Sequence, residues 1–280
     1  MARLKEKVAL VTGGGSGGIG EAIAIALAEE GANVVVNDIV KELADATVEK
    51  IVKRGGIAAP NYNTVAEKEG AESIAETAIK NFGRVDILVN CAANMRFLPT
   101  LDTKDEDWDS IIKVHLYGHF NCIKAVLPQM IKQKGGRIIN FSSRAAFGTI
   151  GNIAYTAAKA GILGMTFFLA SEFKEHGITV NAIIPSADTK LFPGKRPKPV
   201  KATMPEPFSI EPEYVAPIVV YLSTDEAKDV TGRFIYASGG DLCFFAQPLE
   251  LQANAPLFVR KMGKWSIEEL EMMVPSLLGI

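Results

Sequence analysis

Two side chains with complementary chemistry, Tyr155 and Lys159, stand four positions apart in the segment YTAAK. Residues four apart lie on one face of a helix, so the ammonium group can lie close to the phenol. Its positive charge can lower the phenol pKa and make the phenol a proton acceptor near neutral pH. The same spacing also occurs by chance on ordinary surface helices. Here it follows a serine pair, Ser142 and Ser143, and a glycine-rich loop. The combination indicates a nicotinamide-dependent alcohol dehydrogenase or ketone reductase.

The glycine-rich loop, residues 12–20 (TGGGSGGIG), follows a predicted strand and precedes a helical pattern. Glycines permit the turn and let the backbone approach a pyrophosphate, while the helix N-terminus supplies N–H donors and a positive dipole. A purely structural glycine turn is the alternative, and the strand–loop–helix context argues against it.

Asp38 ends the second predicted strand. A carboxylate at this place can accept hydrogen bonds from the ribose hydroxyls of adenosine, and it would repel a 2′-phosphate. A solvated loop carboxylate is the alternative. The position favours a cofactor site for NAD over one for NADP.

Short apolar segments rich in β-branched residues alternate with helical patterns along most of the chain, which predicts a parallel sheet covered by helices on both faces. The fold class is therefore α/β: a single Rossmann-type, doubly wound domain with a seven-stranded parallel sheet and a C-terminal tail extension. The predicted strands are residues 8–12, 33–37, 57–62, 87–90, 137–142, 179–184 and 233–237.

The domain organisation follows from where this alternation stops. We assign residues 1–245 to the Rossmann domain, with a substrate lid at about 187–207, and residues 246–280 to the extension. The lid contains a proline-rich basic stretch at 193–201, which indicates a loop. The extension carries a capping-box signature at 266–269 and enough apolar residues to pack on the domain or on a neighbouring subunit.

Composition excludes several classes of protein. The chain has 280 residues, of which 48% are hydrophobic, and a formal net charge of −2. Near-neutral charge argues against general nucleic-acid or membrane-surface binding. The sequence shows neither a signal peptide nor a long apolar run, so we expect a cytoplasmic protein. Cys91, Cys122 and Cys243 sit in apolar stretches without CxxC spacing, which indicates buried free thiols in a reducing compartment.

These features resemble the short-chain dehydrogenase/reductase family from Lys7 to about Asp241. Besides the glycine loop, the resemblance rests on the segment NCAA at 90–93, similar to the family's NNAG, and on Ser143, Tyr155, Lys159, Pro185 and Thr189. Three segments resemble more closely the (R)-3-hydroxyacyl-CoA dehydrogenase part of peroxisomal multifunctional enzymes of type 2. They are VVVND at 34–38, VHLYG at 114–118 and PEYVAP at 212–217.

The resemblance implies that Tyr155 is the catalytic acid/base, that Lys159 lowers its pKa and binds the nicotinamide ribose, and that Ser143 binds the substrate oxygen. A serine donor and a phenol can together stabilise an oxyanion that develops as hydride leaves. The predicted catalytic residues are Ser143, Tyr155, Lys159 and His115. The predicted cofactor-binding residues are Gly13, Ser16, Gly18, Ile19, Gly20, Asp38, Asn63, Thr64, Asn90, Ala92, Tyr155, Lys159, Pro185 and Thr189.

Two spacings depart from the family pattern. The glycine loop is one residue longer than usual, which could loosen pyrophosphate binding. The segment between serine and tyrosine is one residue shorter than usual if Ser143 is catalytic, whereas Ser142 keeps the usual spacing. Alignment of the preceding strand favours Ser143, because alternate strand residues face opposite sides.

His115 stands where many family members carry an asparagine that anchors a proton-relay water. An imidazole that titrates near neutrality could take this role, and a core histidine is the equal alternative. His115 and His119 also have the i, i+4 spacing of a metal-binding pair. No further ligands converge on them in the sequence, so no metal site is predicted.

The substrate prediction depends on the lid. Its basic side chains could contact the phosphates of coenzyme A, or could simply be solvated. We therefore predict an NAD-dependent dehydrogenase of 3-hydroxyacyl-CoA. The alternatives are a steroid, alicyclic or aromatic secondary-alcohol dehydrogenase, a catalytically silent subunit of a hetero-oligomer, and an NADPH-dependent 3-oxoacyl reductase, which Asp38 disfavours. An apolar pocket wall is predicted from Phe97, Leu98, Phe147, Phe192 and Met204. The resemblance further implies a homo- or hetero-tetramer that assembles through residues 108–130 and 155–173.

Overall fold

The computed structural model describes residues 2–15, 17–148, 152–189 and 209–245, to which all structural statements below refer. The chain divides into two units, Met1–Phe245 and Ala246–Ile280. The second unit lies outside the described residues, as do Ser16 and the lid residues 190–207 with their basic side chains, Phe192 and Met204.

One sheet of eight strands forms the centre of the domain, in the order β3-β2-β1-β4-β5-β6-β7-β8. The strands are β1 (Val8–Thr12), β2 (Asn33–Asn37), β3 (Ile57–Asn61), β4 (Ile87–Asn90), β5 (Gly136–Phe141), β6 (Ile178–Pro185), β7 (Phe234–Ser238) and β8 (Asp241–Phe244). All neighbouring pairs are parallel except β7 and β8, which are antiparallel. The doubly wound α/β prediction is confirmed, and its seven strands are found with ends within one residue.

The prediction of a seven-stranded, wholly parallel sheet is wrong by one strand. Gly239 and Gly240 both have positive φ angles, which L-residues with side chains rarely adopt. They form a two-residue connection that turns the chain back along β7, as glycine pairs do in hairpins. The resulting strand β8 is short and lies at the sheet edge, so it has little apolar alternation by which to be recognised.

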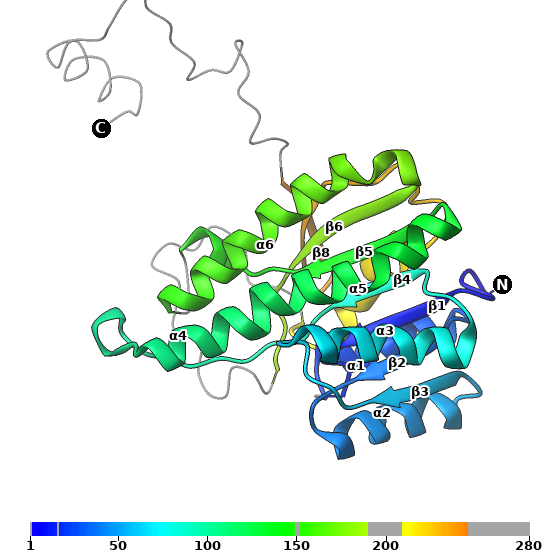
Figure 1. Cartoon of the computed structure of the whole chain (residues 1–280), viewed down its shortest axis with the longest axis horizontal. Helices are drawn as coiled ribbons and strands as arrows, with labels where there is room; N and C mark the ends of the chain where they lie inside the picture. Colours follow the sequence, from blue (N-terminus) through cyan, green and yellow to red (C-terminus); the bar gives the residue numbers. More distant parts are fainter. Residues whose placement is uncertain (1, 16, 149–151, 190–208, 246–280) are drawn as a thin grey trace, which may run out of the picture. The chain divides into compact units, whose positions relative to one another are not determined.

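Helices cover both faces of the sheet, as Figure 1 shows. They are α1 (Ile19–Glu29), α2 (Lys41–Lys53), α3 (Lys68–Phe82), α4 (Asp105–Ile112), α5 (Gly118–Gln133), α6 (Ile153–Glu172) and α7 (Ala216–Ser223). Alternate residues of β1 enter different cores, because successive strand side chains point to opposite faces. Ala9 and Val11 pack with α1, α2 and α7, whereas Val8 and Leu10 pack with α3 and α5.

Polar residues occupy the carboxyl ends of five adjacent strands. Thr12 pairs in register with Asn37 and Asn90, Asn37 pairs with Asn61, and Asn90 pairs with Asn140. The strand order reverses direction between β1 and β4, and open α/β sheets bind ligands at such a point. The fold therefore predicts a ligand site at this edge of the sheet.

By length and composition alone, α6 is the one described helix that could cross a membrane. Its buried residues include Tyr155 and Lys159, which the sequence predicts to be catalytic. Burial of polar functional side chains on this helix fits a helix of a protein core.

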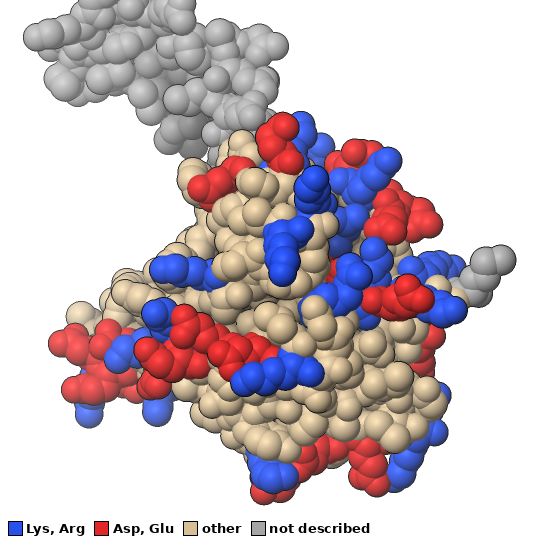
Figure 2. Space-filling view, turned by 45° about the vertical axis from the view of Figure 1, so that its right-hand side comes forward, with Lys and Arg blue, Asp and Glu red and all other residues tan. Residues whose placement is uncertain are grey.

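Figure 2 shows one face of the molecule, on which positive and negative side chains interleave.

Candidate active site

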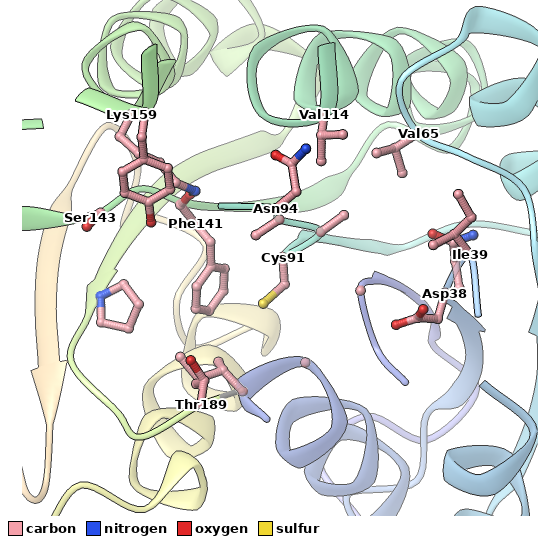
Figure 3. Close-up of a pocket in the computed structure, with 18 of the residues that line it drawn as sticks. Asp38, Ile39, Val65, Cys91, Asn94, Val114, Phe141, Ser143, Lys159 and Thr189 are labelled. Atoms are coloured by element: carbon pink, nitrogen blue, oxygen red, sulfur yellow. The ribbon is translucent and has the colours of Figure 1, made fainter. Parts of the chain in front are cut away.

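A cleft of about 600 Å³ opens at the carboxyl edge of the sheet. In Figure 3, Asp38 lies at one end of the cleft, Ser143 and Lys159 lie at the opposite end, and Cys91 lies between them. The predicted site residues that line it are Gly13, Ile19, Gly20, Asp38, Asn63, Thr64, Ala92, Ser143, Tyr155, Lys159, Pro185 and Thr189. Folding thus brings residues from both halves of the domain to one place.

Backbone crowding explains two glycines of the loop between β1 and α1. Gly13 has a φ of +65°, and a β-carbon there would lie 2.8 Å from the Ala92 Cα. A β-carbon on Gly20 would lie 2.2 Å from the Gly13 carbonyl oxygen. The loop therefore holds the N-terminus of α1 close to the end of β4 at the cleft. Glycine-lined backbone at a helix N-terminus fits a pyrophosphate group.

The Asp38 carboxylate is held in place by two backbone N–H groups. One carboxylate oxygen, Oδ1, accepts a hydrogen bond from the Val40 N–H at 2.9 Å, and Oδ2 accepts one from the Gly15 N–H at 3.3 Å. The side chain is only 8% exposed. Each oxygen retains a second acceptor site, so a carboxylate held this way at the end of β2 fits the ribose diol of a nucleotide.

Three asparagines connect the ends of β2 and β3. Asn37 Nδ2 donates to the Asn63 carbonyl oxygen at 2.8 Å and to Asn61 Oδ1 at 3.1 Å. Asn61 Oδ1 also accepts from the Asn63 N–H at 2.9 Å. This network shapes the segment that carries Asn63 and Thr64 into the cleft. Sequence reasoning missed Asn37 and Asn61, although an asparagine at or next to the end of each of these two predicted strands was the available signal.

Thr12 connects the ends of β1 and β4 through hydrogen bonds to its side-chain hydroxyl. Its Oγ1 accepts hydrogen bonds from the Cys91 and Ala92 N–H groups at 3.1 and 3.2 Å. The hydroxyl thereby fixes the backbone of the NCAA segment against the glycine loop. Asn90, a predicted cofactor residue, does not line the cleft; its side chain is buried and donates to Asn140 Oδ1 at 3.0 Å. Gly18 likewise lies outside the lining, at the N-cap of α1.

Ser143 and Ser142 have different partners. Ser143 accepts from the Ala145 N–H at 3.1 Å and also hydrogen-bonds the Tyr155 side chain. Ser142 Oγ donates to the Lys159 carbonyl oxygen at 2.8 Å and so joins the end of β5 to α6. The geometry supports Ser143 as the serine beside the reacting atoms and gives Ser142 a structural bond.

Lys159 is buried beneath the phenol. Its Nζ donates to the Phe141 carbonyl oxygen at 2.6 Å and lies 5.5 Å from the centroid of the Tyr155 ring. Burial lowers the pKa of Lys159 to about 8, because a low-dielectric surrounding disfavours the charged form. The residue is 3% exposed and lines the cleft.

A net lowering of the Tyr155 pKa is not found, and stabilisation of the phenolate by Lys159 stays a prediction. Burial raises the pKa of Tyr155 to about 12, and the hydrogen bond with Ser143 opposes this rise. The physical reason is that loss of water outweighs the hydrogen bond with Ser143. The Lys159 ammonium is itself directed at the Phe141 carbonyl oxygen.

A buried ladder of hydrogen bonds fixes α6 on the sheet. Asn140 Nδ2 donates to Thr166 Oγ1 at 3.0 Å, and Asn140 accepts from Asn90. At the helix start, Asn152 Oδ1 accepts from the Tyr155 N–H at 2.8 Å, which is an N-cap bond. These contacts set the position of Tyr155 in the cleft. Sequence reasoning did not identify Asn140, Asn152 or Thr166.

Residues 7–198 of the chain match the family described as short chain dehydrogenase. The chain belongs to the short-chain dehydrogenase/reductase family. It is therefore an enzyme, an oxidoreductase that acts on CH–OH groups with a nicotinamide cofactor, as its named relatives also indicate.

Two relatives and one solved structure illustrate the similarity. The chain is 37% identical over 243 residues to 3-oxoacyl-[acyl-carrier-protein] reductase FabG of Thermotoga maritima, covering 85% of this chain and 98% of FabG. It is 39% identical over 248 residues to peroxisomal multifunctional enzyme type 2 of Drosophila melanogaster, covering 85% of this chain and 40% of that enzyme. A short chain dehydrogenase from Mycobacterium avium has a TM-score of 0.84 at 36% identity, covering 99% of this chain and 96% of that one.

These matches confirm both resemblances stated from the sequence. The chain spans less than half of the fly multifunctional enzyme, so the similarity concerns one part of that protein. The fold similarity to the mycobacterial short-chain dehydrogenase extends over nearly the whole chain.

His115, the departure from the usual asparagine of short-chain dehydrogenases, does not reach the cleft. It is fully buried in the π-helical turn Lys113–Tyr117 between α4 and α5, edge-on to the Tyr155 ring at a centroid distance of 5.1 Å. Its Nε2 lies 2.7 Å from the Asn94 carbonyl oxygen, to which a protonated Nε2 donates. Burial lowers the pKa of His115 well below its usual value. The expectation that it titrates near neutrality is therefore wrong, while its relay role stays a prediction.

His119 lies one turn further along the helix and is 2% exposed. It hydrogen-bonds the backbone carbonyls of His115 and Asn90, and burial lowers its pKa to about 3. Within the described residues, no group of three or more His, Cys, Asp or Glu side chains is gathered at these histidines or elsewhere.

We expect the buried His119 to make the fold sensitive to acid. Below pH 6.5 the His119 imidazole binds a proton in the unfolded chain, but in the folded protein it stays neutral down to about pH 3. The free energy of unfolding therefore falls as pH falls through this window. At pH 4 the loss should approach about 3 kcal/mol. Thermal unfolding midpoints measured from pH 7 to pH 4 should decline less steeply in His119→Leu than in the wild type. An equal slope in both would contradict the assignment, and His176→Gln, at an exposed position, is the matched control.

The predictions of buried cysteines and of an apolar cleft wall are each confirmed only in part. Cys122 is buried, whereas Cys91 and Cys243 are only half-buried, and Cys91 lines the cleft; all three are free thiols. Burial raises the pKa of Cys91 to about 12, so its thiol stays protonated. Of the described members of the predicted apolar wall, Phe97 lines the cleft, and Leu98 and Phe147 do not.

Proposed function

We propose that this short-chain dehydrogenase oxidises a 3-hydroxyacyl thioester with NAD, giving the 3-oxoacyl product. The observation that carries the proposal is the Ser143, Tyr155 and Lys159 constellation at the end of the cleft opposite Asp38. The nicotinamide, when bound, supplies the hydride acceptor. The chain's own residues must then bind the substrate oxygen and take up its proton.

The roles of the catalytic residues follow from their contacts. The Ser143 hydroxyl can donate a hydrogen bond to the substrate oxygen, and Tyr155 Oη accepts the proton that the alcohol loses. The ammonium of Lys159 stabilises the resulting phenolate charge, which a buried site would otherwise disfavour. Because burial raises the pKa of Tyr155 to about 12, we expect oxidation to quicken as pH rises.

The predicted cofactor residues would hold NAD along the cleft. Gly13 and Gly20 allow the loop backbone to pack closely at the start of α1, where the pyrophosphate would bind. Asp38 would accept hydrogen bonds from the adenosine ribose, with Asn63 and Thr64 on the adenine side. Pro185 and Thr189, at and beyond the end of β6, would contact the nicotinamide, and Lys159 would bind the nicotinamide ribose.

Asp38 gives a direct test of cofactor choice. We expect the wild type to prefer NAD to NADP, because a 2′-phosphate would meet a fixed carboxylate. Asp38→Ser should weaken NAD binding by about 10- to 100-fold, the size of a charge-assisted hydrogen bond, and should narrow the preference over NADP. Titration of NAD and NADP into the wild type and Asp38→Ser measures both affinities. Asp229→Ser, at an exposed position, is the control. Tighter binding of NADP by the wild type would show that Asp38 does not select the cofactor.

The substrate class is supported by the relative FabG, a reductase of 3-oxoacyl groups on acyl carrier protein, and by the three segments that resemble the (R)-3-hydroxyacyl-CoA dehydrogenase part of the multifunctional enzymes. The test is NADH formation from a panel of 3-hydroxyacyl-CoAs and matched CoA-free secondary alcohols. Activity on thioesters alone would support the proposal. Activity on free steroid, alicyclic or aromatic alcohols instead would replace the thioester by one of those classes.

The relative named FabG also favours a second candidate, reduction of a 3-oxoacyl thioester. This is the same hydride transfer in the opposite direction, with Tyr155 as the proton donor. An NADPH preference would support it, and the Asp38 titration above distinguishes the two cofactors.

We further propose a tetramer in the cytoplasm. Exposed aromatic side chains on α4, α5 and α6, namely Trp108, Phe120 and Phe168, support assembly through residues 108–130 and 155–173, since apolar surface of this kind favours an interface. Three free thiols support a reducing compartment. Light scattering of the purified protein measures the oligomeric state.

A further inference from the structure

The glycine loop between β1 and α1, one residue longer than the family pattern, packs directly against helix α2. A β-carbon on Gly15 would lie 2.6 Å from the Ala44 backbone nitrogen and 2.6 Å from the Leu43 carbonyl carbon. Glycine at this position therefore allows a contact between two backbones that any side chain would prevent. The longer loop is thus accommodated on the first turns of α2.

Thr47, on α2, attaches this loop by a buried hydrogen bond. The residue is fully buried, and its Oγ1 donates to the Gly14 carbonyl oxygen at 3.1 Å. Two other acceptors lie slightly farther from the hydroxyl, namely the Leu43 carbonyl oxygen at 3.3 Å and Glu21 Oε1 at 3.4 Å. Glu21 Oε1 also accepts from Lys50 Nζ. A hydroxyl has one proton to donate, and we assign it to the nearest acceptor, the Gly14 carbonyl oxygen.

Two further hydrogen bonds hold the loop at the end of β2. The Gly14 N–H donates to the Asn37 carbonyl oxygen at 2.9 Å, and the Gly15 N–H donates to Asp38 Oδ2 at 3.3 Å. Gly14 is therefore held from β2 through its nitrogen and from α2 through its carbonyl oxygen. A loop that is already ordered loses less binding free energy when it closes on a ligand.

We propose that Thr47 is a positioning residue for the cofactor, which holds the lengthened loop against α2 in the conformation that binds a nucleotide pyrophosphate. The inference rests on the proposed function only in placing the pyrophosphate at the start of α1. The extra glycine, which by itself would loosen the loop, is offset by this bond. Without the hydroxyl the loop would spend part of its time away from α2, and the apparent affinity would fall with the fraction of competent loop.

The test compares two ligands that differ by a diphosphate group, ADP and adenosine, in calorimetric titrations of the protein. Thr47→Val replaces the hydroxyl by a methyl group of similar size. It should weaken the binding of ADP and of NAD about 3- to 10-fold, the size of one hydrogen bond, and leave adenosine binding unchanged. The kcat at saturating NAD should stay the same, so that only KM for NAD rises. Thr47→Ser, which keeps the hydroxyl, should retain the wild-type affinity for ADP.

Thr224→Val is the matched control for the loss of a buried hydroxyl. Thr224 is 2% exposed, its Oγ1 donates to the Tyr221 carbonyl oxygen at 2.8 Å, and it does not line the cleft. This variant should be less stable than the wild type but should keep the wild-type ratio of ADP to adenosine affinity. A role of Thr47 in stability alone would give the same unchanged ratio in Thr47→Val.

Gly15→Ala tests the same contact from the side of the loop. Its β-carbon would collide with the Ala44 backbone, so the loop must move off α2. We expect weaker binding of ADP and unchanged binding of adenosine. Gly135→Ala is the matched control, because a β-carbon there would approach no closer than 3.8 Å to the Gly177 carbonyl oxygen, and it should weaken neither ligand. If Thr47→Val does not fold, Gly15→Ala decides by the same criterion.

An equal loss of ADP and adenosine affinity in Thr47→Val, or an unchanged affinity for ADP, would overturn the inference. Both ligands are titrated without an alcohol, so failure of the thioester proposal would leave the comparison intact. A wild type that binds ADP no more tightly than adenosine would remove the pyrophosphate from the loop and overturn the inference, whichever alcohol the enzyme oxidises.

Discussion

Replacement of Tyr155 by phenylalanine is expected to abolish turnover while NAD binding stays largely intact. The change removes only the hydroxyl that hydrogen-bonds Ser143 and takes the substrate proton. Positioned proton transfer contributes about 10²- to 10⁴-fold, and the same hydroxyl also stabilises the developing oxyanion. We therefore expect a loss of at least about 10³-fold in kcat. The ring, its contact with His115 and the N-cap bond at Asn152 remain, so the fold should persist.

The measurement is steady-state NADH formation, together with titration of NAD into the variant. Tyr221→Phe is the matched control, since Tyr221 is exposed on α7 and does not line the cleft. Persistent turnover in Tyr155→Phe would remove Tyr155 from the mechanism. Loss of NAD binding together with activity would indicate that the cleft had collapsed, and circular dichroism would then reveal the structural change.

Replacement of Lys159 by methionine should have the second-largest effect on activity, a fall of at least about 100-fold. Methionine fills a similar volume but cannot stabilise the phenolate of Tyr155 or bind the nicotinamide ribose. We expect both kcat and the affinity for NAD to decrease, in contrast to Tyr155→Phe. Lys132→Met, at an exposed position, should leave both quantities unchanged. Full activity in Lys159→Met would contradict the proposed role.

The stability of the same variant has a pH signature. The pKa of Lys159 is lowered from 10.5 to about 8, so between these values the unfolded chain binds more protons than the folded one. Wild-type stability relative to Lys159→Met should therefore rise by about 3 kcal/mol as pH rises from about 8 to 10.5. Chemical denaturation across this range measures the difference. A constant difference would show that the ammonium is not desolvated in the folded protein.

Local signals in the chain were sufficient for most of the fold. The β-branched runs placed seven strands, because buried parallel strands are apolar on both faces. Strand β8 was missed, since its pairing depends on the hairpin at Gly239 and Gly240 and the strand has only four residues. The prediction for the extension 246–280 and that for the lid beyond Thr189 remain predictions, as they fall outside the described residues.

The sequence by itself predicted the cofactor loop, Asp38 and the Tyr155–Lys159 pair, because these depend on residue type and short spacings. Only the tertiary structure separated Ser143 from Ser142, since the two hydroxyls differ in which neighbours they meet. Only burial decided that His115 is neutral and that the phenol pKa is raised. The supporting hydrogen bonds of Thr12, Asn37 and Asn140 likewise join residues far apart in the chain. Desolvation and side-chain partners are set by packing through space, and sequence spacing carries no record of them.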